Sequence, residues 1–233
     1  MNGYKSYKYK PNGSMSVLIS ENCYALPVLT RFGIALGFGD KSVLEVCRDN
    51  CVDVDTFIAV ISLTERGGNQ REVSGRRVSI ESLIDYLYNS HHFFLQFRLP
   101  EMRRKLVAAL NDGEDDLNLA VIGYFDNFVS TLKKHTQNED RKLFPYVRAL
   151  LQGEKPDKQT IVLGKQHERI QSSLTEFKNV LIKYYPSKKA NEINSFLFDV
   201  FNCERDLASH NAVEELLFKP AIEEMVNNLS KTV

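Results

Sequence analysis

The fold is decided by two stretches of sequence, LKKHTQNEDRKLFPY at residues 132–146 and LASHNAVEELLFKP at residues 207–220. In each stretch, a histidine followed four residues later by a glutamate interrupts a series of apolar residues spaced by three and four. Residues at positions i and i+4 lie one above the other on the same face of a helix. Each stretch therefore predicts an amphipathic helix whose apolar face carries one His-x-x-x-Glu pair.

The apolar spacing continues outward from both stretches and indicates four long amphipathic helices. The expected helices span about residues 79–110, 115–151, 160–185 and 188–228. Pro100 and Pro145 are expected to kink or break the first and the second of them. Alternation of apolar and polar residues, which is typical of strands, does not persist for more than a few residues. Because short connections make consecutive helices antiparallel, we predict an all-α protein with an up-down-up-down four-helix bundle.

The residues before the bundle show three short helical patterns, which begin near Pro27, Ser42 and Asp53. Ser and Asp are favoured at helix N-caps, where a side-chain oxygen accepts a backbone N–H. The polar, glycine-containing stretch from Glu65 to Arg77 is typical of a linker. We therefore expect a small helical N-terminal domain at residues 1–76 and the four-helix bundle at residues 77–233.

The composition of the chain argues against some classes of binding partner. The 233 residues contain 30 basic and 30 acidic side chains, so the chain lacks the basic surplus that nucleic-acid binding usually requires. No apolar run approaches the ~20 residues needed to span a bilayer. The N-terminal MNGYKSYKYK has no apolar stretch of the secretory-signal type, and the four cysteines are too scattered for a disulfide framework. We expect a cytoplasmic protein that binds neither nucleic acid nor membranes.

The other two expected helices also place a histidine on their apolar faces. In the third helix this residue is His167. The first helix contains the adjacent pair His91 and His92, and neighbouring residues point about 100° apart, so only one of the two can face the bundle interior. Apolar residues at helical spacing precede both histidines, and periodicity alone leaves the choice open.

One histidine from each helix and one glutamate from each of two helices form a donor set that suits iron, manganese or zinc. Burying carboxylates is costly unless they are paired or bound to metal, and two such positions are hard to explain by packing. Two carboxylates can bridge two metal ions and leave positions open for a bridging oxygen and a small ligand. Haem is the rival cofactor, but its one or two axial ligands leave the glutamates unexplained. After the metal site and haem, the third interpretation of these histidines and glutamates is a metal-free bundle with internal ion pairs.

The segments 135–139 and 210–214, each followed by Leu-Phe and then a proline, resemble hemerythrin-type di-iron helices. Over roughly residues 15–230 the chain resembles the RIC family (repair of iron centres), which pairs a small N-terminal helical domain with a hemerythrin-like bundle. In that family the first-helix ligand lies eight residues before the proline of a Leu-Pro step, which here selects His92 over His91. The resemblance implies two non-haem iron ions, oxo- and carboxylate-bridged, with manganese or zinc as substitutes. The implied ligands are His92, His135, Glu139, His167, His210 and Glu214.

Two departures refine the resemblance. Oxygen-carrying hemerythrins have a second histidine one turn after the third-helix ligand, where this chain has Gln171, so the site resembles the four-histidine RIC type. Many RIC members have adjacent cysteines in the N-terminal domain, where this chain reads Gly-Phe-Gly-Asp at residues 37–40. Cys47 and Cys51 are one turn apart and could be redox partners, but a structural role is favoured because free cysteine commonly packs as a small hydrophobe.

The resemblance implies a function in the repair or protection of iron–sulfur clusters under nitrosative or oxidative stress. Such a protein would act by donating iron, or by binding and reducing nitric oxide at its di-iron centre. The implied partners are damaged iron–sulfur proteins, nitric oxide or O2 as small ligands, and a second copy of the chain in a homodimer. The alternative is a binding or sensing module for O2, nitric oxide or iron that performs no turnover, and the sequence leaves open whether the protein is an enzyme.

Overall fold

In its described residues the computed structural model is predominantly helical, and it divides into two compact units. The structure describes residues 8–65, 73, 77–112, 116–154 and 165–231. One unit is His91–Ala208, and the other combines Met1–Ser90 with Ser209–Val233. The two boundaries fall inside single helices, α6 (Ile80–His92) and α11 (Ala190–Val213). None of the helices in the described part of the chain has both the length and the apolar character that a membrane span requires.

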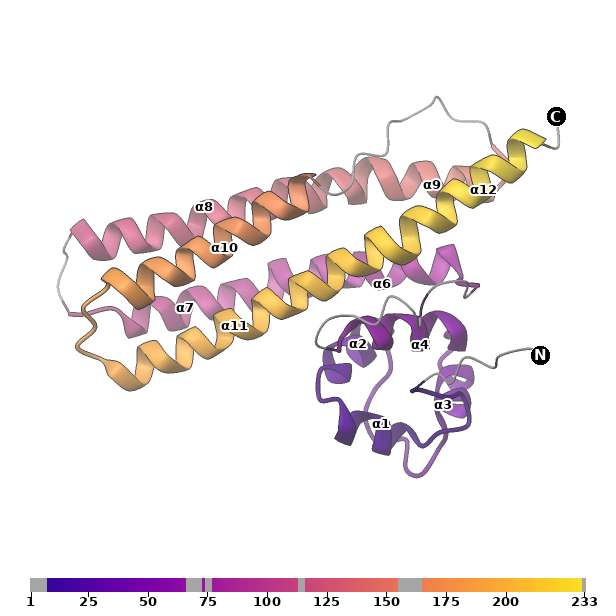
Figure 1. Cartoon of the computed structure of the whole chain (residues 1–233), viewed down its shortest axis with the longest axis horizontal. Helices are drawn as coiled ribbons and strands as arrows, with labels where there is room; N and C mark the ends of the chain where they lie inside the picture. The colour runs from indigo at the N-terminus through magenta and orange to yellow at the C-terminus, as the bar shows by residue number, and fades with distance from the viewer. Residues whose placement is uncertain (1–7, 66–72, 74–76, 113–115, 155–164, 232–233) are drawn as a thin grey trace, which may run out of the picture. The chain divides into compact units, whose positions relative to one another are not determined.

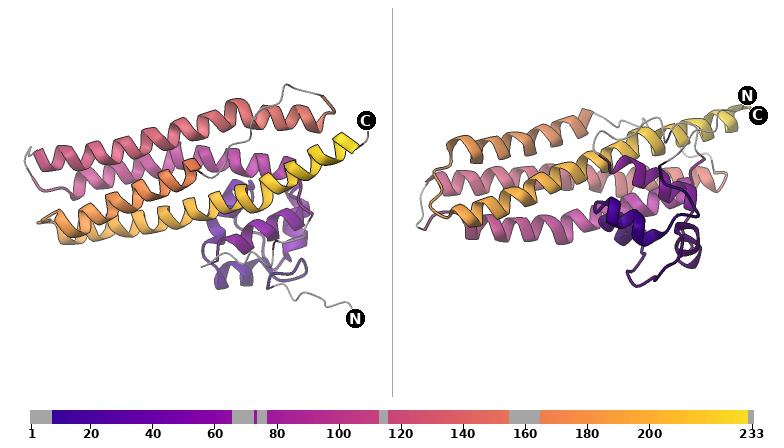
Figure 2. Two further views of the ribbon diagram at one scale, coloured as in Figure 1. Left: turned by 45° about the horizontal axis from the view of Figure 1, so that its top comes forward. Right: turned by 60° about the horizontal axis from the view of Figure 1, so that its bottom comes forward.

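The unit His91–Ala208 is a four-helix bundle. Its helices lie side by side in Figures 1 and 2, and among the described residues of the chain there is no strand, only an isolated bridge in the other unit. The bundle consists of η1 (Phe93–Arg98) with α7 (Leu99–Ala109), α8 (Asp116–Asn138) with η2 (Glu139–Leu143) and α9 (Phe144–Leu151), α10 (Lys165–Tyr184), and α11 as far as Ala208. The predicted all-α, up-down-up-down four-helix bundle is confirmed.

Aromatic side chains form the centre of the bundle core. Phe125 on α8 lies with its ring centroid 5.5 Å from that of Phe177 on α10 and 6.2 Å from that of Phe196 on α11. All three rings are fully buried. Burying a phenylalanine side chain contributes roughly 1.5–3 kcal/mol, so this trio strongly stabilises the packing of the three helices. It also fixes the rotation of α8 and α10, and with it the faces that carry the predicted ligands.

Three segments of the long helices are π-helical. They are η1, η2 and η3 (Glu214–Phe218), and each leads into a short stretch that contains a proline, Pro100, Pro145 or Pro220. A proline lacks an N–H, and its ring clashes with the carbonyl four residues earlier in an α-helix. The wider π turn relieves this conflict, so each helix continues through its proline rather than breaking there. Both η2 and η3 begin at the glutamate of a His-x-x-x-Glu pair, and π turns frequently occur at functional sites.

In the other unit, the described residues before α6 form four short helices. They are α1 (Met15–Glu21), α2 (Ala25–Arg31), α3 (Val43–Asp49) and α4 (Val54–Leu63). Ser42 and Glu45 form a reciprocal capping box at the start of α3. The carboxylate of Asp53 accepts the N–H of Thr56 at 2.8 Å at the start of α4. Both predicted N-caps are therefore confirmed, whereas Pro27 lies inside the first turn of α2 rather than at its start.

Within this unit, the short helices pack against the middle and the last part of α6. Phe32 stacks on Tyr86 with ring centroids 4.9 Å apart, and its edge contacts Phe57 at 5.5 Å. The side-chain amide of Asn89 donates to the backbone carbonyl of Arg31 at 2.8 Å. The expected linker lies mostly outside the described residues, so the domain boundary near residue 76 stays a prediction.

Candidate metal centre

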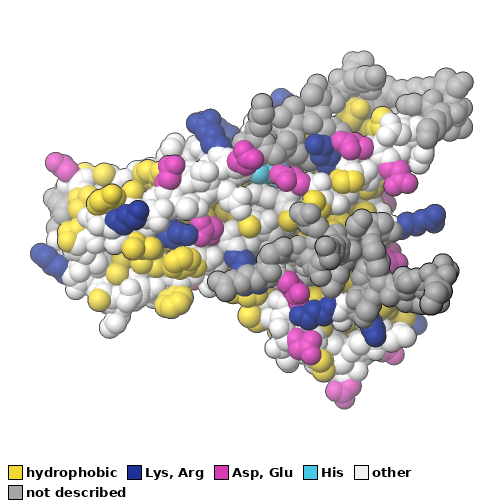
Figure 3. Space-filling model, viewed as in Figure 1, with side chains coloured by type: hydrophobic (Ala, Val, Ile, Leu, Met, Phe, Trp, Pro, Cys, Tyr) yellow, Lys and Arg dark blue, Asp and Glu magenta, His cyan; other side chains and the backbone are white. Residues whose placement is uncertain are grey.

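Burial separates one histidine of the chain from the other four. His92 is exposed, whereas the rest are at most 8% exposed: His91, His135, His167 and His210. Histidine accordingly contributes only a small area to the face of the molecule seen in Figure 3. Imidazoles are seldom buried without a hydrogen-bonding or coordinating role, so these four positions mark the candidate site.

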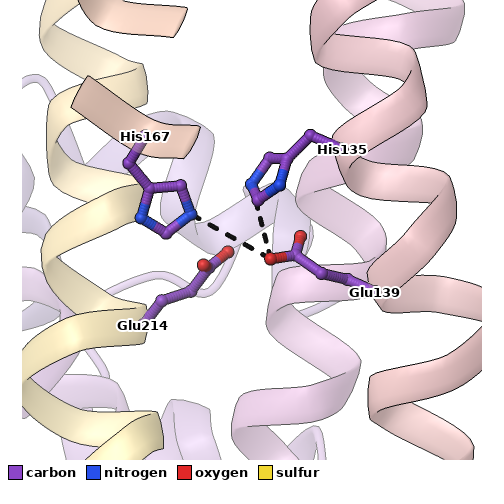
Figure 4. A group of neighbouring side chains, drawn as sticks. All are labelled: His135, Glu139, His167 and Glu214. Atoms are coloured by element: carbon purple, nitrogen blue, oxygen red, sulfur yellow. Dashed lines mark ion pairs between the residues drawn. The ribbon is translucent and has the colours of Figure 1, made fainter. Parts of the chain in front are cut away.

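In the bundle unit, three of the buried histidines surround one carboxylate. The Glu139 side chain is 3% exposed, and its Oε2 atom lies 3.4 Å from Nε2 of His91. Its Oε1 atom lies 3.4 Å from Nε2 of His135 and 4.0 Å from Nε2 of His167. Figure 4 shows His135 and His167 directed at Glu139 from different helices. We call His91, His135, Glu139 and His167 the Glu139 cluster.

Each of the two shorter separations in the cluster suits two ligands that share one metal ion, His91 with Oε2 of Glu139 and His135 with Oε1 of Glu139. Two ligand atoms that each lie about 2.1 Å from one ion are about 3.0–3.4 Å apart, depending on the coordination geometry. The two shorter separations from Glu139 reach this range, and each exceeds the 2.9–3.0 Å that is usual for an N–H···O hydrogen bond. Ligand atoms of His135, Glu139 and His167 all lie within 4.8 Å of one another. The donor set of imidazole nitrogens and a carboxylate suits iron, manganese or zinc.

Two polar side chains orient two histidines of the cluster through hydrogen bonds to Nδ1, the ring nitrogen farther from Glu139. Nδ1 of His91 lies 2.7 Å from Oδ1 of Asp140, and Nδ1 of His135 lies 3.0 Å from Oε1 of Gln166. Both oxygens accept a hydrogen bond from Nδ1–H, which leaves the lone pair of Nε2 directed toward Glu139. Sequence reasoning missed both residues. Their only signal is adjacency, because Asp140 follows a predicted ligand and Gln166 precedes one.

The structure brings His91, and not His92, to the cluster. His91 is 1% exposed and contacts Glu139, whereas the expected ligand His92 is exposed and lies outside the Glu139 cluster. The spacing argument counted eight residues back from Pro100. The π-helix η1 lies within that interval, and a π turn contains more residues than an α turn. A residue count across η1 therefore shifts the predicted position by one residue.

The second His-x-x-x-Glu pair belongs to the other unit. Nε2 of His210 lies 2.8 Å from Oε1 of Glu214, and the two side chains are 3% and 1% exposed. The pair bridges the end of α11 and the first residue of η3, as the i, i+4 spacing predicts. The local arrangement thus repeats that of His135 and Glu139, which bridge α8 and η2.

The sequence of residues 82–222 matches the family model of the hemerythrin HHE cation binding domain. The match covers 141 of the 233 residues. The chain belongs to the hemerythrin family. Every buried histidine and both glutamates lie inside the matched range, and the family's cation-binding character agrees with the buried cluster. This hemerythrin-like chain is therefore a metal-binding protein. No curated protein matches its sequence.

The four cysteines of this hemerythrin-like chain, all among the described residues, are thiols that form no disulfide. Cys47 is fully buried, and that burial raises the pKa of its thiol to about 12. Its thiol is therefore protonated at neutral pH, and the thiolate is the reactive form. Cys51 is exposed and adopts a left-handed backbone conformation with φ of 56°. The buried, protonated Cys47 supports the structural reading of these cysteines over the redox one.

Proposed function

We propose that this hemerythrin-family protein holds two iron ions, binds nitric oxide or O2 at them, and repairs or protects iron–sulfur clusters. The observation that carries the proposal is the buried Glu139 cluster, in which three histidines from different helices face one carboxylate. Buried groups of this kind are costly unless a metal ion or a partner compensates them.

The proposed ligand set joins the Glu139 cluster with the second pair, His210 and Glu214. This set is supported by the same local structure in both His-x-x-x-Glu pairs. In each pair the two residues are spaced i and i+4, the glutamate begins a π segment, and a proline follows. The family match also spans both pairs. His91 replaces His92 in the set, for the structural reasons given above. The proposed ligands are His91, His135, Glu139, His167, His210 and Glu214.

The chain's own residues have three tasks in this proposal. The carboxylates of Glu139 and Glu214 would hold the two iron ions and would compensate their cationic charge. The histidines present Nε2 as the donor atom, and Asp140 and Gln166 fix that orientation through Nδ1. The burial of the four histidines and the two glutamates excludes water. When bound, the two irons supply electrons and an open coordination position for a diatomic ligand.

The repair function rests on the resemblance to the RIC family. Two features support it over oxygen transport. Gln171 stands where an oxygen carrier has a further histidine, and helices α1–α4 precede the matched domain. The thiol chemistry of the twin cysteines is not part of the proposal, because residues 37–40 contain no cysteine.

A sensing function without turnover is the second candidate, and two contacts favour it. The N-terminal helices are attached to α6 by the hydrogen bond between Asn89 and Arg31 and by the stacking of Phe32 on Tyr86. Asn89 lies two residues before His91 on the same helix. A shift of His91 on ligand binding would therefore be transmitted along α6 to the small helices.

Anaerobic addition of nitric oxide to the reduced, iron-loaded protein separates the two candidates. Production of nitrous oxide over many turnovers, or restored activity of a nitric-oxide-damaged iron–sulfur enzyme, supports the repair function. A stoichiometric nitrosyl spectrum with neither outcome supports sensing. The Glu139→Leu variant is the matched control, since it should bind no iron. A wild-type protein that takes up no iron would overturn both candidates.

A further inference from the structure

The two histidines whose Nδ1 contacts are resolved have chemically different acceptors behind them. Asp140 offers a carboxylate to His91 at 2.7 Å, and its side chain is 21% exposed. Gln166 offers a neutral amide oxygen to His135 at 3.0 Å, and it lies on the exposed side of α10. The shorter contact with the anionic acceptor is the stronger one, because charge-assisted hydrogen bonds are roughly twice as strong as neutral ones.

We propose that Asp140 is a positioning residue that makes the metal site at His91 different from the site at His135. This inference rests on the proposed function, since it concerns the metal that the Glu139 cluster holds. The carboxylate draws the Nδ1 proton toward itself and makes Nε2 of His91 a more basic donor than Nε2 of His135. A more basic donor favours the higher oxidation state, so the metal beside His91 has the lower reduction potential.

The placement of Asp140 in the fold explains how one residue can do this. It follows Glu139 directly and is the second residue of η2. Glu139 directs its carboxylate into the cluster, while Asp140 reaches His91 on a different helix. The ring of His91 also stacks on Phe144, with centroids 5.6 Å apart and planes 12° apart. The hydrogen bond with Asp140 thus restrains the His91 ring within the plane of the imidazole, and the stacking on Phe144 restrains it perpendicular to that plane.

Three variants of the full chain separate orientation from charge. Asp140→Ala removes the acceptor, and we expect apparent Fe²⁺ affinity to fall about 10- to 100-fold, as is typical when the partner of a ligating histidine is lost. Asp140→Asn keeps an oxygen acceptor and removes the charge, so the affinity loss should be smaller while the reduction potential rises. Gln166→Glu adds the charge behind His135 and should lower the potential of the second site, which brings the two potentials closer together.

The matched control is Glu168→Gln, which removes one negative charge from an exposed position next to His167 in sequence. It should leave both potentials unchanged. Fe²⁺ affinity is measured anaerobically against a competing chelator, the potentials by spectroelectrochemical titration, and integrity of the fold by thermal unfolding of the metal-free proteins.

The outcomes separate this inference from the proposed function. A wild-type chain that binds no Fe²⁺ defeats the proposed function. A wild-type chain that binds Fe²⁺ while Asp140→Ala matches it in affinity and potential defeats only the inference. Loss of one whole ion per chain in both Asp140 variants would make Asp140 a ligand and would also overturn the inference. A raised potential in Asp140→Asn with unchanged thermal stability supports it.

Discussion

The Glu139 carboxylate is 3% exposed and faces three imidazoles, an arrangement that suits metal binding better than it suits packing. Desolvating such a charge costs free energy, which hydrogen bonds or a metal ion must offset. In Glu139→Leu, we expect metal binding to be lost. Replacing buried ionic groups by apolar ones is often neutral or stabilising by about 1–4 kcal/mol, so the metal-free variant should be at least as stable as the metal-free wild type. Metal analysis and denaturant unfolding test this, and a variant that keeps its metal with unchanged spectra would show that Glu139 is not a ligand.

His91 and His92 allow a paired test at adjacent residues. His91→Ala removes an imidazole that is 1% exposed and 3.4 Å from Glu139, and it should lower the metal content of the protein. His92→Ala removes an exposed side chain and should leave the metal content unchanged. Metal per chain after purification in the same buffer is the measurement. The reverse pattern would mean that the other face of α6 points inward.

The cysteines provide a test by thiol reactivity and pH. At pH 8, Cys23 and Cys51 should react with a thiol reagent, whereas the buried Cys47 and Cys203 should react only after unfolding. The folded state holds the pKa of Cys47 at about 12, above its ordinary value of 9.0. Between these values the unfolded chain loses a proton that the folded chain keeps, so the free energy of unfolding should fall as pH rises through this window. Cys47→Ala should remove this part of the pH dependence. Rapid labelling of all four thiols in the native protein would contradict the burial of Cys47 and Cys203.

At the scale of the element, the π segments allow one long helix to meet two requirements. Before the π segment, the helix must direct a ligand into the core. After it, the helix must keep its apolar face toward the core, through a stretch that contains a proline. An α-helix extended by one residue would rotate the downstream face by about 100°. The π turn absorbs the extra residue, so both Glu139 and Phe144 can face the interior.

A single-residue deletion tests this account. Removing the exposed Lys142 from η2 should convert the π turn to an α turn and leave a folded helix, because the faces on both sides are preserved. Lys133 is exposed and lies in the middle of α8, where no π turn can absorb a deletion. Removing Lys133 should therefore rotate His135 and Glu139 away from their partners. Thermal unfolding and metal content should therefore be affected much more by the second deletion. Equal damage from both deletions would show that η2 has no spare residue.

At the scale of the whole molecule, the middle of α6 packs against an aromatic residue that follows α2. Tyr86 is fully buried and stacks on Phe32. The fragment 77–233 contains every proposed ligand and should bind as much iron per chain as the full-length protein. It loses the ring that covers Tyr86, so we expect its stability to be lower by roughly 1–3 kcal/mol. Metal analysis and unfolding of the metal-free fragment are the measurements.

Phe32→Ala in the full chain is the control for the fragment. It removes the stacked ring alone and should reproduce part of the stability loss without changing the iron content. If the fragment bound no iron while Phe32→Ala bound it normally, the predicted boundary near residue 76 would be wrong.

The sequence by itself determined the all-α bundle, the two capped N-terminal helices and the two His-x-x-x-Glu pairs. These features are local, because apolar spacing, caps and i, i+4 pairs act within one helix and are written in neighbouring residues. The burial of His135, Glu139, His167, His210 and Glu214 follows from the same spacing, since each lies on the apolar face of its own helix.

Only the tertiary structure decided between His91 and His92 and revealed Asp140 and Gln166. The two histidines differ by about 100° of helix rotation. The π turn η1 changes the rotation between them and Pro100, and the spacing of the apolar residues does not reveal that change. The hydrogen bonds of Asp140 and Gln166 join different helices, residues 91 with 140 and 135 with 166. Such contacts depend on how the helices pack against one another, and the packing of two helices is not encoded in the periodicity of either one alone.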